Sequence, residues 1–364
     1  MSLETAPGNC RESSQRGGAC NLCGGKAAVV LDGAPTLVRC LECGLVSLDR
    51  FPPPAEREAR YQGSYYSEER GERFLRVFEL IVGFFARRRM QAIRKRAPGP
   101  GRILDVGCGR GNLLERFQKN GWQAVGTQIS RSAANAARTL RGVEVIVGEL
   151  PELDLPPSSF QAITFFHVLE HLARPAEYLQ KAHELLADDG LLLVEVPNFA
   201  SPAFRLLGQR SFCLDYPNHL VFFTPSSLRD LLDRSGFAVE EVSRFSLEYS
   251  PYTTLQNLIN FLPGQPNRLY RALSNNREGV CLRRSPWTWL HFMLGALLFL
   301  PALAISLTAL RFGEGNTMRL YCRKKTAGAK GEKSTTSICR LQPTLPHPRS
   351  YDSHLSLWTF SIRR

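Results

Sequence analysis

The first nineteen residues of the chain contain little that is apolar. Residues 1–19 have no hydrophobic run of the kind that a secretory signal peptide requires. We therefore expect a cytoplasmic protein, in which cysteine thiols stay reduced. The same segment is polar and contains several Gly and Ser residues, so we predict that it is disordered.

The sequence also lacks the pattern that nucleic-acid binding would favour. The formal charge of +13 at pH 7 favours an anionic partner, but no aromatic residues alternate with the basic clusters at 87–89 and 94–96. Nucleic acid is therefore not a favoured partner. Much of the charge lies in residues 324–364, where eight Lys or Arg residues accompany only Glu332 and Asp352. This tail has no periodicity, so we predict that it is disordered and assign it no role.

Four of the ten cysteines form two Cys-x2-Cys pairs, separated by sixteen residues and each followed by glycine. Each pair can present two thiolates to one tetrahedral ion, so the spacing predicts a structural zinc in a ribbon over residues 20–50. Short strands near 29–31 and 37–39 should join the pairs. Two disulfides, or unrelated free thiols, are the alternative that a reducing compartment disfavours. The predicted ligands are Cys20, Cys23, Cys40 and Cys43.

A linker and a helix occupy residues 51–100. Three consecutive prolines at 52–54 stiffen the chain, and the apolar spacing over 69–97 predicts one long helix that Pro98 ends. Between them lie three tyrosines that either close a pocket from above or serve packing, namely Tyr61, Tyr65 and Tyr66.

Three glycines follow the apolar run at 103–106, and a helical pattern begins directly after them. They are Gly107, Gly109 and Gly111. A strand, a glycine turn and a helix in this order present backbone N–H groups to a nucleotide-like ligand. A phosphate-binding P-loop would need Lys followed by Ser or Thr after the last glycine, and a dinucleotide fingerprint would need glycine where Asn112 stands. A turn that merely joins strand to helix is the remaining alternative.

From residue 102 onward the chain alternates between strand and helix patterns, which is typical of a doubly wound parallel sheet. Seven strands are expected, at 102–107, 123–127, 143–147, 162–166, 191–196, 238–244 and 318–323. Four helices are expected, at 112–120, 131–140, 176–187 and 226–235. Thr224 and Pro225 fit the N-cap and first position of the last of these helices.

The glycine turn, with Asp105 before it, resembles the first motif of the class I S-adenosylmethionine (SAM)-dependent methyltransferases. The resemblance spans about residues 102–244 and the last strand, and implies a seven-stranded, mostly parallel, Rossmann-like domain over 101–323. The family has an acidic residue where Gln128 stands, to hold the ribose hydroxyls, and Asp where Gln161 stands. The resemblance implies that SAM is bound by Asp105, Gly107, Gly109, Gly111, Gln128, Glu149 and His167.

The segment at 166–172, Phe-His-Val-Leu-Glu-His-Leu, is similar to the post-strand segment of ubiquinone-biosynthesis O-methyltransferases. The resemblance places His167 beside the transferred methyl group, either as a general base or as a ring packed against the adenine. His219 is a second candidate base or acceptor contact. Structural bonding is expected for Glu170 and His171.

The resemblance implies methyl transfer to an O, N or C nucleophile of a small-molecule, glycan or lipid-linked acceptor. A ribbon ahead of such a domain resembles, more loosely, methyltransferases of sugar and polysaccharide biosynthesis. A catalytically silent binding or scaffold protein is the alternative, and Gln128 and Gln161 favour it.

An apolar segment at 287–310 precedes the last strand and approaches the length of a membrane span. A single crossing would separate that strand from its own sheet. Pro301 would let the insertion at 285–311 bend into a hairpin that dips into one leaflet. With arginines at both ends, we expect peripheral or monotopic association with the cytoplasmic membrane face and an amphiphilic acceptor. A lid over the substrate, buried packing and a true span are the alternatives.

Overall fold

The computed structural model describes residues 19–57, 76–262, 264–273, 277–312 and 315–325. Predictions made for residues 1–18, for the first residues of the long helix, for the three tyrosines near its start and for 326–364 fall outside this part of the chain.

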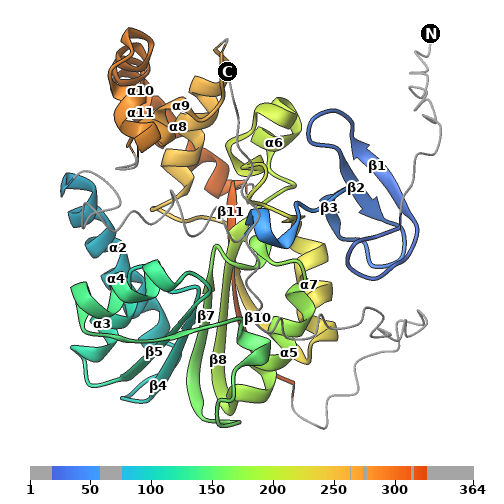
Figure 1. Cartoon of the computed structure of the whole chain (residues 1–364), viewed down its shortest axis with the longest axis vertical. Coiled ribbons are helices and arrows are strands. Elements are labelled where there is room, and N and C mark those ends of the chain that lie inside the picture. Colours follow the sequence, from blue (N-terminus) through green and yellow to red (C-terminus); the bar gives the residue numbers. More distant parts are fainter. Residues whose placement is uncertain (1–18, 58–75, 263, 274–276, 313–314, 326–364) are drawn as a thin grey trace, which may run out of the picture. The chain divides into compact units, whose positions relative to one another are not determined.

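A seven-stranded sheet forms the centre of the fold (Figure 1), and all seven predicted strands are confirmed. The sheet order is β10-β11-β8-β7-β4-β5-β6, and only β11 runs antiparallel to its neighbours. The chain starts at β4, turns one way to β5 and β6, and then returns to β7 on the other side of β4. Ligands bind at such a reversal, outside the carboxyl ends of the strands. The strands are β4 (Arg102–Val106), β5 (Gln123–Gln128), β6 (Glu144–Val147), β7 (Phe160–Phe166), β8 (Leu186–Pro197), β10 (Phe237–Ser243) and β11 (Thr317–Lys324).

Helices cover both faces of this sheet because its strands are apolar on both sides. Ile103 of β4 packs with α2 (Arg76–Arg94) and α3 (Asn112–Gln118) on one face. Its neighbour Leu104 packs with α5 (Pro175–Leu185) and α7 (Pro225–Arg234) on the other. The predicted N-cap is also confirmed, because the Thr224 side chain accepts a hydrogen bond from the Ser227 amide. The remaining described helices and 3-10 turns of this part are α4 (Arg131–Arg141), α6 (Pro202–Leu207), η2 (Leu150–Glu152), η3 (Leu169–His171), η4 (Gly208–Arg210) and η5 (Phe212–Leu214).

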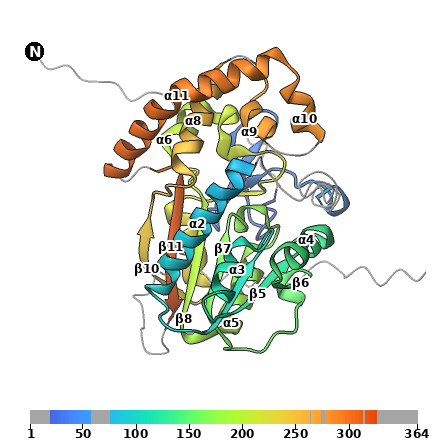
Figure 2. The same ribbon diagram turned by 90° about the vertical axis from the view of Figure 1, so that its left-hand side faces the viewer.

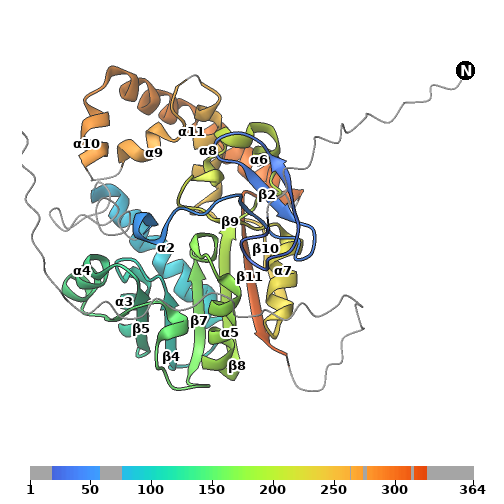
Figure 3. The same cartoon turned by 45° about the vertical axis from the view of Figure 1, so that its right-hand side comes forward.

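The cysteine ribbon forms a second, antiparallel sheet, which includes a strand from far along the chain. Its order is β1-β2-β3-β9, so the ribbon's last strand pairs with β9 of the larger domain (Figure 3). The Leu48 amide donates to the Leu220 carbonyl at 3.0 Å beside this pairing. The two strands expected in the ribbon are confirmed, whereas β3 and β9 were not predicted. Their bounds are β1 (Ala27–Leu31), β2 (Leu37–Cys40), β3 (Val46–Leu48) and β9 (Val221–Phe222).

The apolar insertion forms one helix, α11 (Pro286–Arg311), rather than a hairpin, so that prediction is wrong (Figure 2). Proline removes one hydrogen bond and bends a helix, but it does not end a helix whose flanking turns are held by packing. Here Gly295 lies against Leu269, and Ala302 is buried in the cluster beneath α11. Most other side chains of α11 are exposed, so buried packing is also excluded. The helices beneath it are α8 (Ser250–Asn260), α9 (Arg268–Leu273) and α10 (Arg277–Arg283).

Candidate functional site

The glycine turn lies at the carboxyl end of β4 and leaves little room for side chains. Gly107, Gly109 and Gly111 have φ values of 66°, 56° and 73°, the left-handed conformation that favours glycine. A Cβ at Gly107 would lie 2.7 Å from Val168, and one at Gly111 would lie 2.6 Å from Val143. Because α3 begins directly after Gly111, the turn can present its backbone N–H groups outward, as the sequence predicts.

Asp105 supports this turn from below. Its carboxylate is buried in β4 and accepts a hydrogen bond at 2.7 Å from the Thr164 hydroxyl of β7. Burial raises the pKa of Asp105 to about 6, although Thr164 and the charge of Arg89 work in the opposite direction. Asp105 therefore joins the two strands at the point where the sheet order reverses. A direct contact with SAM stays a prediction.

The sheet order brings the other predicted SAM-binding residues to the same edge, because β4, β5 and β6 are neighbours. Gln128 ends β5, is buried, and accepts from the Ile129 amide at 3.0 Å through its side-chain oxygen. Glu149 follows β6 and lies 3.6 Å from Arg174. Ile129 was missed by sequence reasoning, although it projects an exposed apolar side chain directly after a strand. That side chain could cover one face of an adenine ring.

His167 follows β7 and lies between two buried carboxylates. Its Nδ1 atom is 3.2 Å from Glu170, and its Nε2 atom is 3.4 Å from Glu195. Burial acts to lower the pKa of His167, but the hydrogen bonds and charges of Glu170 and Glu195 outweigh burial and raise it to about 9. The imidazole ring also packs against Tyr249, with ring centroids 4.0 Å apart. At neutral pH His167 is therefore an imidazolium, with a hydrogen on both ring nitrogens.

Buried charged residues from other elements contact the two neighbours of His167, Glu195 and Tyr249. Glu195 of β8 pairs with Arg319 of β11, and the charge of Arg319 lowers the pKa of Glu195 against the effect of burial. Arg89 of α2 lies 2.8 Å from Glu248 and donates to the Tyr249 hydroxyl at 3.2 Å. These residues belong to no motif. Only Glu195 gave a signal in the sequence, as a single acid inside a predicted apolar strand.

His171 and His219 lie on the other side of Glu170. The Nδ1 atom of His171 is 3.0 Å from the Asn218 carbonyl, and that of His219 is 2.9 Å from the Cys213 carbonyl. A carbonyl can only accept, so Nδ1 is the donating nitrogen in each ring, which leaves Nε2 as the ring nitrogen that could take up a proton. One nitrogen of each ring and one Glu170 oxygen lie within 4.8 Å of one another. Glu170 therefore connects the two histidines that the sequence singled out, His167 and His219.

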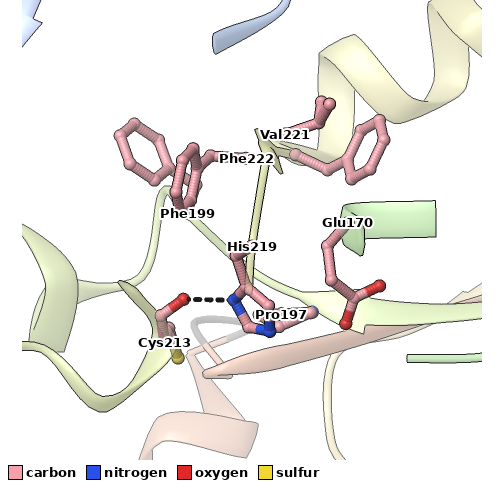
Figure 4. A pocket seen from close by; sticks show the side chains of 8 residues that line it. Glu170, Pro197, Phe199, Cys213, His219, Val221 and Phe222 are labelled. Atoms are coloured by element: carbon pink, nitrogen blue, oxygen red, sulfur yellow. Dashed lines mark hydrogen bonds between the residues drawn. The ribbon is translucent and has the colours of Figure 1, made fainter. Parts of the chain in front are cut away.

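A small cavity lies beside His219 (Figure 4). Glu170 and Cys213 line it together with Pro197, Phe199 and Phe222, so its wall is mainly apolar with few polar groups. Its volume of about 10 Å³ is roughly that of one water molecule, so it marks an apolar spot beside His219 and not the space for a whole acceptor.

The four cysteines of the ribbon converge on one point. Their sulfur atoms lie within 4.8 Å of one another, with 3.4 Å between Cys23 and Cys40 and 3.9 Å between Cys20 and Cys43. Tetrahedral Zn–S bonds of about 2.3 Å would hold the sulfurs about 3.8 Å apart, so the donor set fits zinc. All eight described cysteines are free thiols, so the two disulfides that were the alternative do not occur among them. The backbone amides of Leu22 and Glu42 donate to these sulfurs, as thiolates require.

Comparison with known proteins agrees with this geometry. A family model described as a methyltransferase domain matches residues 82–242. The ubiquinone biosynthesis O-methyltransferase of Xylella fastidiosa is 30% identical over 196 residues, covering 48% of this chain and 77% of that protein. The Vibrio cholerae enzyme of the same name is 26% identical over 171 residues, covering 43% and 68%. A solved SAM-dependent methyltransferase from Archaeoglobus fulgidus is 20% identical, with a TM-score of 0.43 and coverage of 67% and 93%.

A Rossmann-like sheet with a glycine turn at its reversal point defines a class of nucleotide-binding enzymes. Within that class, this chain belongs to the class I SAM-dependent methyltransferases. SAM is accordingly its methyl donor.

Proposed function

We propose that the enzyme methylates a hydroxyl group of a small, amphiphilic acceptor at the carboxyl edge of the sheet. The observation that carries the proposal is the position of His167, Glu170 and His219 directly across the reversal point from the glycine turn. The donor's sulfonium supplies a methyl group attached to a good leaving group. The enzyme's residues must then hold the donor, orient the acceptor and remove a proton.

Donor binding is proposed for the turn and the neighbouring strand ends. The N–H groups around Gly109 would hold the amino-acid portion, since the Gly111 amide already donates to the Cys108 carbonyl, and Gln128 would bind the ribose hydroxyls through its amide. Glu149 would accept from the adenine amino group, with Ile129 against the ring. Gln128 offers one acceptor oxygen where a carboxylate offers two, so its hold on the hydroxyls is weaker than that of an acidic residue.

The two histidines are proposed to have different roles. Since His167 is an imidazolium at neutral pH, it cannot accept a proton there, and both its N–H groups face the carboxylates of Glu170 and Glu195, so we assign it a positioning and electrostatic role. The Cys213 carbonyl engages Nδ1 of His219 and leaves its Nε2 for the acceptor, and His219 lines the cavity, so we assign it the general-base role. The acceptor O–H bond breaks as His219 takes the proton. The oxygen–methyl bond forms, the sulfur–methyl bond breaks, and S-adenosylhomocysteine leaves.

We infer an amphiphilic acceptor from the two helices that lie next to the site, α8 and α11. Tyr249, which contacts His167, directly precedes α8, and the apolar α11 packs on α8. Glycan acceptors, which the ribbon suggested, have no comparable contact in their favour. We further propose that the ribbon holds one structural zinc and that the enzyme works on the cytoplasmic side of the membrane.

The alternative, a catalytically silent scaffold protein, was favoured by Gln128 and Gln161, and the position of Gln161 no longer favours it. Gln161 stands at the start of β7, at the opposite edge of the sheet from the site, and its side-chain oxygen accepts from the Arg102 amide at 2.7 Å. Its departure from the family pattern therefore concerns the sheet and not catalysis. Gln128 remains the single departure at the donor site.

Titration calorimetry with SAM tests the proposal. Binding of SAM and of S-adenosylhomocysteine is expected, and transfer of labelled methyl to hydroxylated amphiphiles such as alkylated catechols should follow. Absence of binding at about 1 mM SAM would contradict the enzyme function. Binding without transfer to any hydroxylated probe would favour the scaffold alternative.

A further inference from the structure

The polarity of α11 is inverted relative to a surface helix of a water-soluble protein, which turns its apolar side chains inward. Its buried positions are small or polar, namely Thr288, His291, Gly295, Ala302 and Ser306. Its exposed positions include the largest apolar side chains, among them Trp287, Trp289, Met293, Leu297, Phe299 and Leu300. The helix therefore presents its largest apolar side chains to its surroundings, and its side toward the protein consists of small and polar residues with the partly buried Phe292 and Leu298 beside them.

Interhelical hydrogen bonds of hydroxyl groups hold the inner face of α11, in addition to the apolar contacts of Ala302 and its neighbours. The Ser306 hydroxyl lies 2.8 Å from the Thr254 hydroxyl of α8 and 3.2 Å from the Ser250 carbonyl. Toward the other end, Arg268 of α9 donates to the Thr288 hydroxyl at 3.1 Å. Small residues and interhelical hydroxyl bonds are how helices pack where the surrounding medium is hydrocarbon, since apolar contacts then gain nothing over lipid.

We propose that α11 lies in the plane of a bilayer surface, with its exposed side immersed in the headgroup and acyl boundary of an anionic membrane. By length and composition the helix could also span a membrane, since its mean hydropathy reaches 2.2 over 18 residues. Its contacts exclude a crossing, because both ends rest on the same layer of helices through Thr288 and Ser306. The following strand, β11, returns at Thr317 to pair with β8 and β10.

The distribution of exposed side chains favours a bilayer over a second copy of the chain. With about 100° per residue, the exposed apolar side chains cover roughly two thirds of the helix circumference. One docked protein surface would cover only a part of this arc, whereas lipid covers all of it. No charged residue occurs between Pro286 and Leu310 to form the polar rim that a protein interface carries.

Basic residues surround this apolar surface where headgroups would lie. Arg284 and Arg311 are exposed at the two ends of α11. The N-terminal half of α2 lies at the same end of the domain (Figure 2) and adds exposed Phe84 beside exposed Arg87 and Arg88. Tryptophans at the first turn of α11 suit the interfacial depth. The charge and the apolar surface together match anionic lipid.

The proposed attachment to a membrane does not depend on the proposed methyl transfer. The inferred class of acceptor rests on that proposed function. A site roofed by α8, with α11 in the bilayer above it, can receive an acceptor whose apolar portion stays in lipid. The two parts of the inference are therefore measured separately, by vesicle binding and by SAM calorimetry.

Vesicle flotation tests the attachment, with full-length protein and vesicles of phosphatidylcholine alone or with about 30% phosphatidylglycerol. The wild-type protein should float with both, more strongly with phosphatidylglycerol and less strongly at high salt. The double substitution Leu297→Glu with Leu300→Glu should lower vesicle partitioning about 100-fold or more, because two exposed leucines no longer enter the acyl region. Its SAM affinity should equal that of the wild type.

Leu41→Glu with Leu206→Glu is the matched control, since these leucines are equally exposed but lie on the ribbon and on α6. This control should float as the wild type does. Wild-type protein that floats with neither vesicle would overturn the proposal, as would equal losses in both double variants. A dimer that forms without vesicles and dissociates in the α11 variant, with no flotation, would assign the surface to a second copy and would also overturn it.

Discussion

The Nδ1 atom of His167 lies 3.2 Å from the buried Oε1 atom of Glu170, three residues later in the chain. This contact and the one with Glu195 keep a proton on His167 up to about pH 9. A group whose pKa is raised by folding contributes stability that is fully present below its unfolded value, near 6.5. That contribution is lost as the pH rises through about 9.

The first prediction is that Glu170→Gln lowers the pKa of His167, because an amide cannot stabilise imidazolium as a carboxylate does. NMR titration of the His167 ring should show the shift. The loss of unfolding free energy between about pH 6.5 and pH 9 should become shallower in the variant. Glu177→Gln, at a half-buried residue of α5 that pairs with Arg174, is the control and should leave both unchanged. An unaltered His167 titration in Glu170→Gln would contradict the assignment.

The second prediction separates the two histidines. His219→Asn should lower kcat/KM about 10²- to 10⁴-fold, because the general base is lost while an amide can still donate to the Cys213 carbonyl. SAM affinity should not change. His183→Asn, on α5 away from the site, is the control. If catalysis is unaffected in His219→Asn but rises with pH through about 9 in the wild type, His167 is the base instead.

The third prediction concerns the glycine turn. Gly109→Leu should abolish SAM binding, because the side chain would fill the space that the donor needs. It should also cost about 1–2 kcal/mol of folding stability, since φ is positive there. Gly121→Leu meets the same backbone strain with open space around its Cβ, so it should lose similar stability and keep SAM binding. Calorimetry and thermal unfolding of the pair distinguish donor binding from strain.

The fourth prediction is that the purified protein contains about one zinc per chain and that Cys40→Ser loses it. The ribbon should become less stable in that variant. SAM affinity should stay largely intact, because the proposed SAM-binding residues lie on the seven-stranded sheet and not on the ribbon. Metal analysis by mass spectrometry measures both proteins. Cys281→Ser, at an exposed cysteine of α10, is the control. Full zinc content in Cys40→Ser would refute the proposed ligands.

The sequence was sufficient for the central sheet, and the physical reason is burial. The central strands are covered on both faces and form continuous apolar runs bounded by glycine or polar residues, so they could be found locally. The edge strand β10 is different, because it contains two glutamates and is largely exposed or half-buried. Strands β3 and β9 have three and two residues, too short for any periodicity. Their pairing exists only because the chain returns to the ribbon after the fifth parallel strand. Local reasoning could not find it.

The site shows the same limit. The motifs identified Gly109, His167 and His219, each beside a recognisable turn. Glu195 and Tyr249 contact His167 from distant segments, and Arg319 acts on it through Glu195. Of these three, only Glu195 stands out in the sequence, as an acid inside an apolar strand. In α11 the composition indicated an apolar helix, but the inversion of its faces depends on which side meets α8. Proline did not break the helix there, because α11 packs against α8 and α9 on both sides of Pro301.

The pairing of β3 with β9 makes the ribbon an integral part of the larger domain. Recombination at the proline-rich linker could not exchange or delete the ribbon without leaving the edge of β9 bare, two residues from His219. A bare edge recruits strands from other molecules. Loss of the ribbon would therefore expose an edge beside His219 unless another strand came to cover it.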